Sequence, residues 1–224
     1  TRGPGVTYPT LYTLRYRRNI DSLAEGATAL DERVNLALHN TYADKVNLVG
    51  HSKGGLVARR YTVDHRDKVR WLMMCQSPNT GALYTYVPRL WGYNLSIMYP
   101  QWPWLRPHSA LPFMRPPTQA QELRSLNNRG LPDGPVYTVI YSDSLPVYYT
   151  VTSTPRIEFG LTWGDGLVPS FSQLGRIRNP NRPFDSDTII PAFEGRIIEQ
   201  VNIPGSHSGY FENPTVQVRI LERL

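Results

Sequence analysis

The stretch that decides the fold runs from Val46 to Tyr61 and reads VNLVGHSKGGLVARRY. Its first four residues are mostly apolar, as in a short buried strand, and the residues from Gly54 onward have the pattern of a helix. The five residues Gly50-His51-Ser52-Lys53-Gly54 therefore form a sharp strand-to-helix turn.

This turn has the G-x-S-x-G pattern, which holds a serine at the carboxyl end of a strand in a strained backbone conformation. Glycine suits positions 50 and 54 because side chains at Gly50 and Gly54 are expected to clash with the neighbouring strand or helix. The backbone N–H of Lys53 lies at the helix N-terminus, where the dipole is positive and stabilises a developing oxyanion. We therefore predict Ser52 as a nucleophile; the alternative is a turn in which the serine is incidental.

Patterns on both sides of this stretch predict further strands and helices. An amphipathic helix carries apolar residues three and four positions apart from Leu23 to Leu38, with Asn19 and Asp21 as candidate caps. Alternating or apolar runs predict strands, and a proline-led segment predicts a terminal helix; the strands are Leu11–Arg17, Val69–Met74, Val136–Tyr141 and Arg196–Ile203, and the helix is Pro214–Leu224. Strands that alternate with helices are typical of an α/β domain with a parallel sheet.

A serine nucleophile needs a base, because its hydroxyl reacts poorly at neutral pH. Among the five histidines, His207 follows the last predicted strand in the loop PGSHSG, whereas the backbone position of His51 directs that residue away from Ser52. The acid that orients the base comes between them if the chain order is Ser, Asp, His. Asp165, in a tight glycine-flanked turn, is favoured over Asp143, which follows the strand that ends at residue 141.

Four segments in the same order resemble one protein family. They are the turn VNLVGHSKGGLVARRY, the segment Gln76–Gly81, which is similar to the family's T-P-H-x-G turn, the segment Gly164–Pro169, which is similar to its G-D-G-x-V-P acid loop, and His207. The sequence thus resembles the bacterial lipase and esterase branch of the α/β-hydrolases, which is related to the lecithin-cholesterol-type acyltransferases.

The resemblance implies an α/β-hydrolase fold with a central, mostly parallel sheet flanked by helices. It also implies hydrolysis of carboxylic esters through an acyl-enzyme. In this scheme Ser52 is the nucleophile, His207 is the base and then the acid, and Asp165 orients His207. No metal and no organic cofactor is needed.

The chain departs from the family pattern in two places. Lys53 stands where family members commonly have Met or Gln; only its backbone N–H is required, but its charge can bias substrate choice. The family's second oxyanion donor follows an earlier strand, and Arg2–Gly5 is too close to Leu11 to supply it, since the connection needs at least about 10–12 residues. We therefore expect residues 1–224 to form one domain that lacks roughly its first 30–60 residues, N-terminal strands included.

The α/β pattern is interrupted between about Leu83 and Pro135. This insertion is rich in proline and aromatic residues, and a short helical piece is expected at Thr118–Asn127. Long loop-rich segments in compact domains are usually functional. We interpret the insertion as a cap or lid in which Trp91, Trp102 and Trp104 contact acyl chains; the alternative is a packed structural cap.

Composition and charge exclude several other classes of protein. The 224 residues are 40% hydrophobic and 19% charged, as in ordinary globular proteins, and no segment approaches the roughly 20 apolar residues of a membrane-spanning helix. The net charge is +6, but only Lys45, Lys53 and Lys68 of the 24 basic residues are lysines and no basic run occurs, so no nucleic acid is expected as a partner. Cys75 alone can form neither an intrachain disulfide nor a multi-cysteine zinc site.

These inferences predict an enzyme that acts on a small-molecule or lipid ester and makes transient contact with a lipid interface. Two alternatives stay open. One is a lipid acyltransferase or thioesterase with the same triad. The other is a non-catalytic binding protein of the same fold, favoured by the missing second oxyanion donor. A secreted and a cytoplasmic location are both compatible with the sequence.

Overall fold

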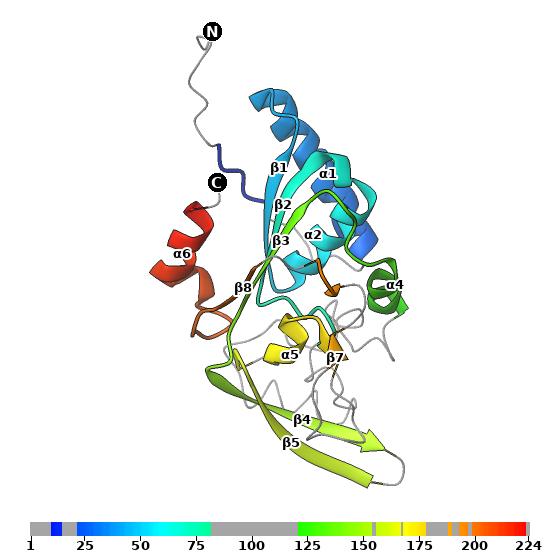
Figure 1. Ribbon diagram of the computed structural model, residues 1–224, viewed down its shortest axis with the longest axis vertical. Helices are drawn as coiled ribbons and strands as arrows, with labels where there is room; N and C mark the ends of the chain where they lie inside the picture. The colour runs from blue at the N-terminus through cyan, green and yellow to red at the C-terminus, as the bar shows by residue number, and fades with distance from the viewer. Residues whose placement is uncertain are drawn as a thin grey trace.

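The computed structural model describes residues 10–14, 22–81, 121–153, 156–166, 168–177, 188–189, 193–196 and 199–222 (Figure 1). Most of the predicted insertion, including Trp91, Trp102 and Trp104, lies outside these residues. Within the described residues, no helix is both long and apolar enough to cross a membrane.

A four-stranded sheet forms the centre of the molecule. Its strands are β1 (Val46–His51), β2 (Val69–Cys75), β3 (Val136–Tyr141) and β8 (Glu199–Asn202), in the order β1-β2-β3-β8. All three neighbouring pairs are parallel, and β1 pairs with β2 from Val46↔Val69 to His51↔Cys75. The predicted parallel sheet is therefore confirmed, and all its strands end at one edge, where the loops that follow them come together.

Helices cover both faces of this sheet. Helices α1 (Leu23–Thr41) and α2 (Lys53–Asp64) lie on one face, and α6 (Pro214–Leu221) lies on the other (Figure 1). Successive residues of a strand point to opposite faces. In β2, accordingly, Leu72 and Met74 join the core beneath α2, while Met73 and Cys75 join the core beneath α6.

The predicted caps of α1 are wrong by one to three residues. The N-cap is Ser22, whose Oγ accepts a hydrogen bond of 3.0 Å from the backbone N–H of Glu25. Ser22 and Glu25 have the S-x-x-E spacing of a capping box, in which a serine side chain bonds the N–H of the residue three positions on. That spacing was a better signal for the helix start than an Asn or Asp alone.

The strand predicted over Leu11–Arg17 is not observed in its described part. Residues 11–14 have no regular secondary structure, and Leu11 is 75% exposed. An alternating pattern makes a strand only where a neighbouring strand supplies hydrogen bonds and a core to face. Among the described strands, none pairs with these residues.

An antiparallel hairpin between β3 and the turn at residues 165–169, called here the acid turn, was not predicted. It consists of β4 (Leu145–Ser153) and β5 (Arg156–Gly164), which project away from the main sheet (Figure 1). The remaining elements are the helices α4 (Gln121–Arg129) and α5 (Ser170–Gln173), the 3-10 turns η1 (Arg66–Lys68) and η6 (Tyr210–Glu212), and the paired strands β6 (Arg176–Ile177) and β7 (Thr188–Ile189). Helix α4 overlaps the helical piece expected at residues 118–127 and buries Leu123 and Leu126.

Candidate active site

Ser52 lies in the turn between β1 and α2 with a φ of 54° and a ψ of −126°. A non-glycine residue rarely adopts such a conformation, which costs on the order of 1–3 kcal/mol and is found mostly at functional sites. The backbone N–H of Ser52 donates to the carbonyl of Cys75 at 2.9 Å, which anchors the turn to β2. Ser52 is the N-cap residue of α2, yet its side chain does not cap the helix. Its Oγ is directed to another partner.

Close packing requires glycine at two positions near Ser52, Gly50 and Gly55, of which only Gly50 was predicted. A Cβ at Gly50 would lie 2.6 Å from the Cα of Gly55, and a Cβ at Gly55 would lie 1.7 Å from Ser77 Oγ. At Gly54, no atom of the described residues outside the helix's own backbone lies within 4 Å of an added Cβ. The predicted clash at Gly54 is therefore wrong. The tight contact between α2 and the end of β2 falls one residue later.

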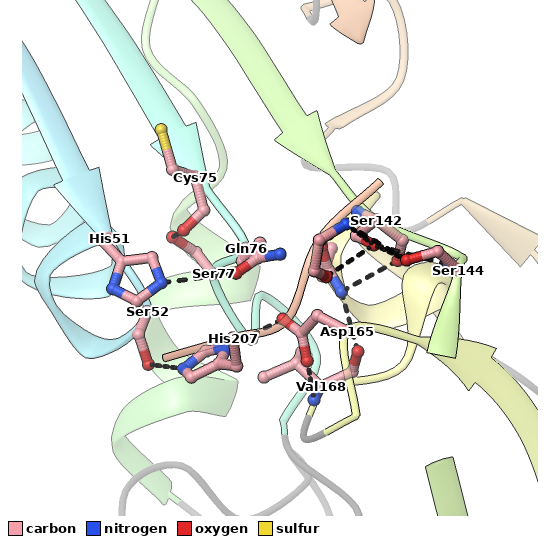
Figure 2. Close-up of polar contacts among 12 residues, drawn as sticks. His51, Ser52, Cys75, Gln76, Ser77, Ser142, Ser144, Asp165, Val168 and His207 are labelled. Carbon is pink, nitrogen blue, oxygen red and sulfur yellow. Dashed lines mark hydrogen bonds and ion pairs between the residues drawn. The ribbon is translucent and has the colours of Figure 1, made fainter. Parts of the chain in front are cut away.

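The structure brings His207 to Ser52. Strand β8 ends at Asn202, and His207 lies in the segment that follows it, residues 203–209, called here the base loop. The Nε2 atom of His207 is 2.9 Å from Ser52 Oγ, a distance at which the hydroxyl can donate to the ring nitrogen (Figure 2). His207 is 8% exposed, and its backbone N–H donates to the carbonyl of Asp165 at 3.0 Å.

Asp165 completes the hydrogen-bonded chain, and Asp143 does not take part in it. Asp165 is 1% exposed, and its Oδ2 lies 2.7 Å from Nδ1 of His207. Its Oδ1 accepts a 2.7 Å hydrogen bond from the backbone N–H of Val168, so the carboxylate is held at both oxygens (Figure 2). Asp143 is exposed and accepts instead from the side-chain amide of Asn202 at 2.7 Å. Of the two aspartates left open by the sequence, only Asp165 contacts His207.

A buried glutamine that sequence reasoning missed joins the loops of the site. The side-chain N–H₂ of Gln173 donates to the carbonyl of Val168 at 2.7 Å, and its Oε1 accepts from the N–H of Ser142 at 3.0 Å. The hydroxyl of Ser142 donates in turn to the carbonyl of Gly205 in the base loop. Gln173 is completely buried. The acid turn, the end of β3 and the base loop are thereby connected through polar contacts.

His51 lies beside His207, and Gln76 lies beside His51. The ring centroids of His51 and His207 are 4.8 Å apart, and His51 Nε2 is 3.4 Å from Gln76 Oε1. Burial is the main cause that lowers the pKa of His51 to about 4, and the neighbouring charge of His207 acts in the same direction. His51 is thus uncharged at neutral pH. The position of His51 in the turn did not reveal this contact with His207.

Lys53 is the first residue of α2, so its backbone N–H stands at the positive end of the helix dipole, next to Ser52. This is the position expected for one oxyanion donor. The segment Arg2–Gly5, considered for a second donor, lies outside the described residues. In the described part of the chain, no group of three or more His, Cys, Asp or Glu side chains could hold a metal ion.

Buried Cys75 lies at the end of β2 in the core beneath α6. Burial raises the pKa of its thiol to about 12, so the thiolate is not formed at neutral pH. Cys75 is therefore a buried, protonated thiol at the end of a strand.

Comparison with known proteins finds solved structures of similar fold but no match by sequence. No protein-family model and no curated protein matches the chain. Among solved structures, the chain is similar to the mature form of the lipase BlEst2 from Bacillus licheniformis, with a TM-score of 0.55 and 12% identity over 90% of this chain and 74% of that one. The propeptide form of the same lipase gives a TM-score of 0.51 and 12% identity, over 84% of this chain and 37% of that one.

Proposed function

We propose that this chain, which has the α/β-hydrolase fold, is a serine hydrolase that cleaves carboxylic esters. The observation that carries the proposal is the unbroken series of contacts from the Asp165 carboxylate through His207 to Ser52 Oγ, with distances of 2.7 and 2.9 Å. A nucleophile, a base and a group that orients the base, each within hydrogen-bond reach of the next, are the requirements of acyl transfer through serine.

The geometry suggests a role for each residue. Ser52 Oγ attacks the ester carbonyl carbon while Nε2 of His207 takes its proton, and the negative charge on the carbonyl oxygen is stabilised by the N–H of Lys53. The Asp165 carboxylate stabilises the imidazolium through Nδ1. The tetrahedral intermediate then loses the alcohol, which receives the proton from Nε2. Water attacks the acyl-enzyme while Nε2 of His207 takes its proton. The bond between Ser52 Oγ and the acyl carbon then breaks, Oγ receives the proton from Nε2, and the carboxylic acid leaves.

For the substrate we propose an apolar, lipid-like acyl ester. Phe211 is 42% exposed and its ring centroid lies 5.2 Å from that of His51, so an apolar surface is available close to His207. The similar solved structure, BlEst2, is a lipase. The roles of Trp91, Trp102 and Trp104 as acyl contacts, the transient lipid contact and the single-domain organisation remain part of the proposal.

Reaction with a fluorophosphonate probe tests the proposal directly. The probe phosphonylates an activated serine, so the wild-type chain should be labelled once, at Ser52, and should release p-nitrophenol from p-nitrophenyl esters. Ser52→Ala should abolish labelling and turnover. Ser208→Ala is the matched control, since this exposed serine is next to His207 in sequence, and it should behave as wild type.

The outcomes separate the remaining possibilities. A folded wild-type chain that is neither labelled nor active would overturn the proposal in favour of a binding protein. Labelling at Ser52 with faster turnover of thioesters, or with transfer to an added alcohol in preference to water, would assign the same triad to a thioesterase or an acyltransferase. Undiminished activity of Ser52→Ala would refute the assignment of the nucleophile.

A further inference from the structure

His207 lies on a loop, so contacts from other segments must hold the faces of its ring in place. Its backbone N–H donates to the carbonyl of Asp165, and its ring is held at the two nitrogens by Asp165 and Ser52. Contacts at the two nitrogens do not fix the faces of the ring, which can tilt about the line that joins them. Catalysis is sensitive to such movement, because a misplacement of about 1 Å can cost about 100-fold in rate.

His51 supplies a surface on one side of this ring. It is the last residue of β1, and its ring centroid is 4.8 Å from that of His207 with an angle of 37° between the ring planes. The rings of Tyr210 and Phe211 follow the base loop and lie 6.1 and 5.2 Å from His51. Tyr210 is 1% exposed, so His51 cannot move toward it without displacing part of the core. His51 is therefore enclosed between His207 and these two aromatic residues.

Gln76 fixes the orientation of His51 and does so at an energetic cost. Gln76 is completely buried at the end of β2, and its Oε1 lies 3.4 Å from Nε2 of His51 (Figure 2). Its backbone has a φ of 48°, a strained value for a residue that is not glycine, and its side-chain Nε2 has no hydrogen-bond partner among the described residues. A buried donor without a partner is itself destabilising. Strain and an unsatisfied donor at one residue suggest that its conformation serves a purpose other than stability.

We propose that His51 is a positioning residue that, held by Gln76, supports the ring of His207 and keeps Nε2 directed at Ser52 Oγ. This inference rests on the proposed function, because it assigns a supporting pair to the same base. His51 carries no charge at neutral pH, since burial lowers its pKa to about 4. It therefore supports His207 without repelling the imidazolium that forms during the reaction. Of the titratable groups that face it, His207 and Asp165 belong to the triad and Tyr210 is buried.

Steady-state kinetics of three variants tests this inference. His51→Ala removes the supporting ring and should lower kcat by about 10- to 100-fold while KM stays close to wild type, because His51 acts through His207 and not on the substrate. His51→Phe keeps a ring of similar size and should recover most of that loss. Gln76→Met removes the acceptor with little change in shape and should lower kcat less than His51→Ala does. His39→Ala, at an exposed position near the end of α1, is the control and should have wild-type kinetics.

Combining the variants gives a sharper criterion. Since both residues act through the same contact, the double variant His51→Ala/Gln76→Met should be no slower than His51→Ala alone. Losses that multiply in the double variant would overturn the proposal, and so would an unchanged kcat in His51→Ala or an effect confined to KM. Circular dichroism establishes that each variant folds. If His51→Ala does not fold, Gln76→Met provides the test, and a wild-type kcat in that variant would overturn the proposal.

A measurement that does not depend on turnover separates this inference from the proposed function. In a ¹⁵N-histidine NMR spectrum, the Nδ1–H proton of His207 reports its hydrogen bond to Asp165. This signal should broaden or shift in His51→Ala and return toward the wild-type position in His51→Phe. If the wild-type protein does not react with the fluorophosphonate probe and is inactive, but the His207 signal changes in His51→Ala as described, the proposed hydrolase is refuted and the positioning contact is retained. An active enzyme whose His207 signal is the same in all variants would refute the positioning role alone.

Discussion

Gly54 and Gly55 are neighbours in the first turn of α2, but a methyl group at the two positions should have opposite effects. At Gly55 the added Cβ would lie 1.7 Å from Oγ and 2.8 Å from Cβ of Ser77, whereas at Gly54 it would meet no atom of the described residues within 4 Å. Real Cβ atoms do not approach other atoms to such short distances, so α2 or the end of β2 must shift in Gly55→Ala. Both residues are helical, and neither requires a positive φ.

The magnitudes follow from comparing the two variants. Replacing glycine by alanine in a helix stabilises a protein by about 0.5–1 kcal/mol, and this gain is shared by both substitutions. Overpacking costs about 1–3 kcal/mol and applies only to Gly55→Ala. The free energy of unfolding of Gly55→Ala should therefore be lower than that of Gly54→Ala by about 1–3 kcal/mol. Gly54→Ala should be at least as stable as wild type.

Urea denaturation, followed by tryptophan fluorescence and circular dichroism, measures these differences. Ser77→Gly removes both atoms that clash with the added Cβ. The substitution Gly55→Ala should therefore lower the free energy of unfolding less when it is made in the Ser77→Gly variant than when it is made in wild type. Equal midpoints for Gly54→Ala and Gly55→Ala would refute the steric explanation. It would also be refuted if Ser77→Gly gave no relief.

Two further predictions concern the acid and His51. Asp165→Asn should lower kcat by about 10⁴-fold in the p-nitrophenyl ester assay, because an amide at this position favours the wrong tautomer of His207; Asp143→Asn should stay near wild type, and similar losses in both would contradict the assignment of the acid. Burial lowers the pKa of His51 from 6.5 to about 4, so between these values the unfolded chain binds the proton more readily than the folded one. The stability that neutral His51 contributes is thus present above pH 6.5 and is lost as the pH falls to 4. Urea denaturation should show wild type losing about 2–3 kcal/mol more than His51→Asn between pH 7.5 and 4.5; parallel losses would show that His51 titrates normally.

Sequence patterns were sufficient where local chemistry determines structure. The strand before Ser52 and the helix after it were predicted because apolar runs and a glycine turn act over a few residues. The strand at 136–141 matches β3, for the same reason. The start of α1 was misplaced since Ser22 and Glu25 form a cap only as a pair. The hairpin β4–β5 was missed, although its two runs of β-branched and aromatic residues flank a Ser-Thr-Pro segment typical of a turn.

Contacts between distant segments account for what could not be predicted. Glycine is required at position 55 because of Ser77, which lies 22 positions later in the sequence, just after β2. Nothing in the local G-x-S-x-G pattern distinguishes Gly55 from Gly54. The glycine-flanked turn favoured Asp165 over Asp143, but the contact of Asp165 with His207 itself depended on where the hairpin β4–β5 returns the chain. The contact between His51 and His207 depended on the path of the base loop. Each of these three contacts joins segments that meet only at the edge of the folded sheet, so no single segment of the sequence reveals it.

The register of the parallel sheet explains how these distant segments meet. Beyond the last residues of the strands, the ladder continues through three backbone hydrogen bonds: Ser52 N–H to Cys75, Gln76 N–H to Ile140, and Ile203 N–H to Tyr141, at 2.9, 2.8 and 2.9 Å. Ser52, Gln76 and the start of the base loop are therefore each placed by a backbone hydrogen bond to the neighbouring strand. A slip of one residue in any pair would turn the side chains of a strand to the opposite face. The same apolar residues that select the register, such as Met74 and Val139 beneath α2, thus also place Ser52, Gln76 and His207 within reach of one another.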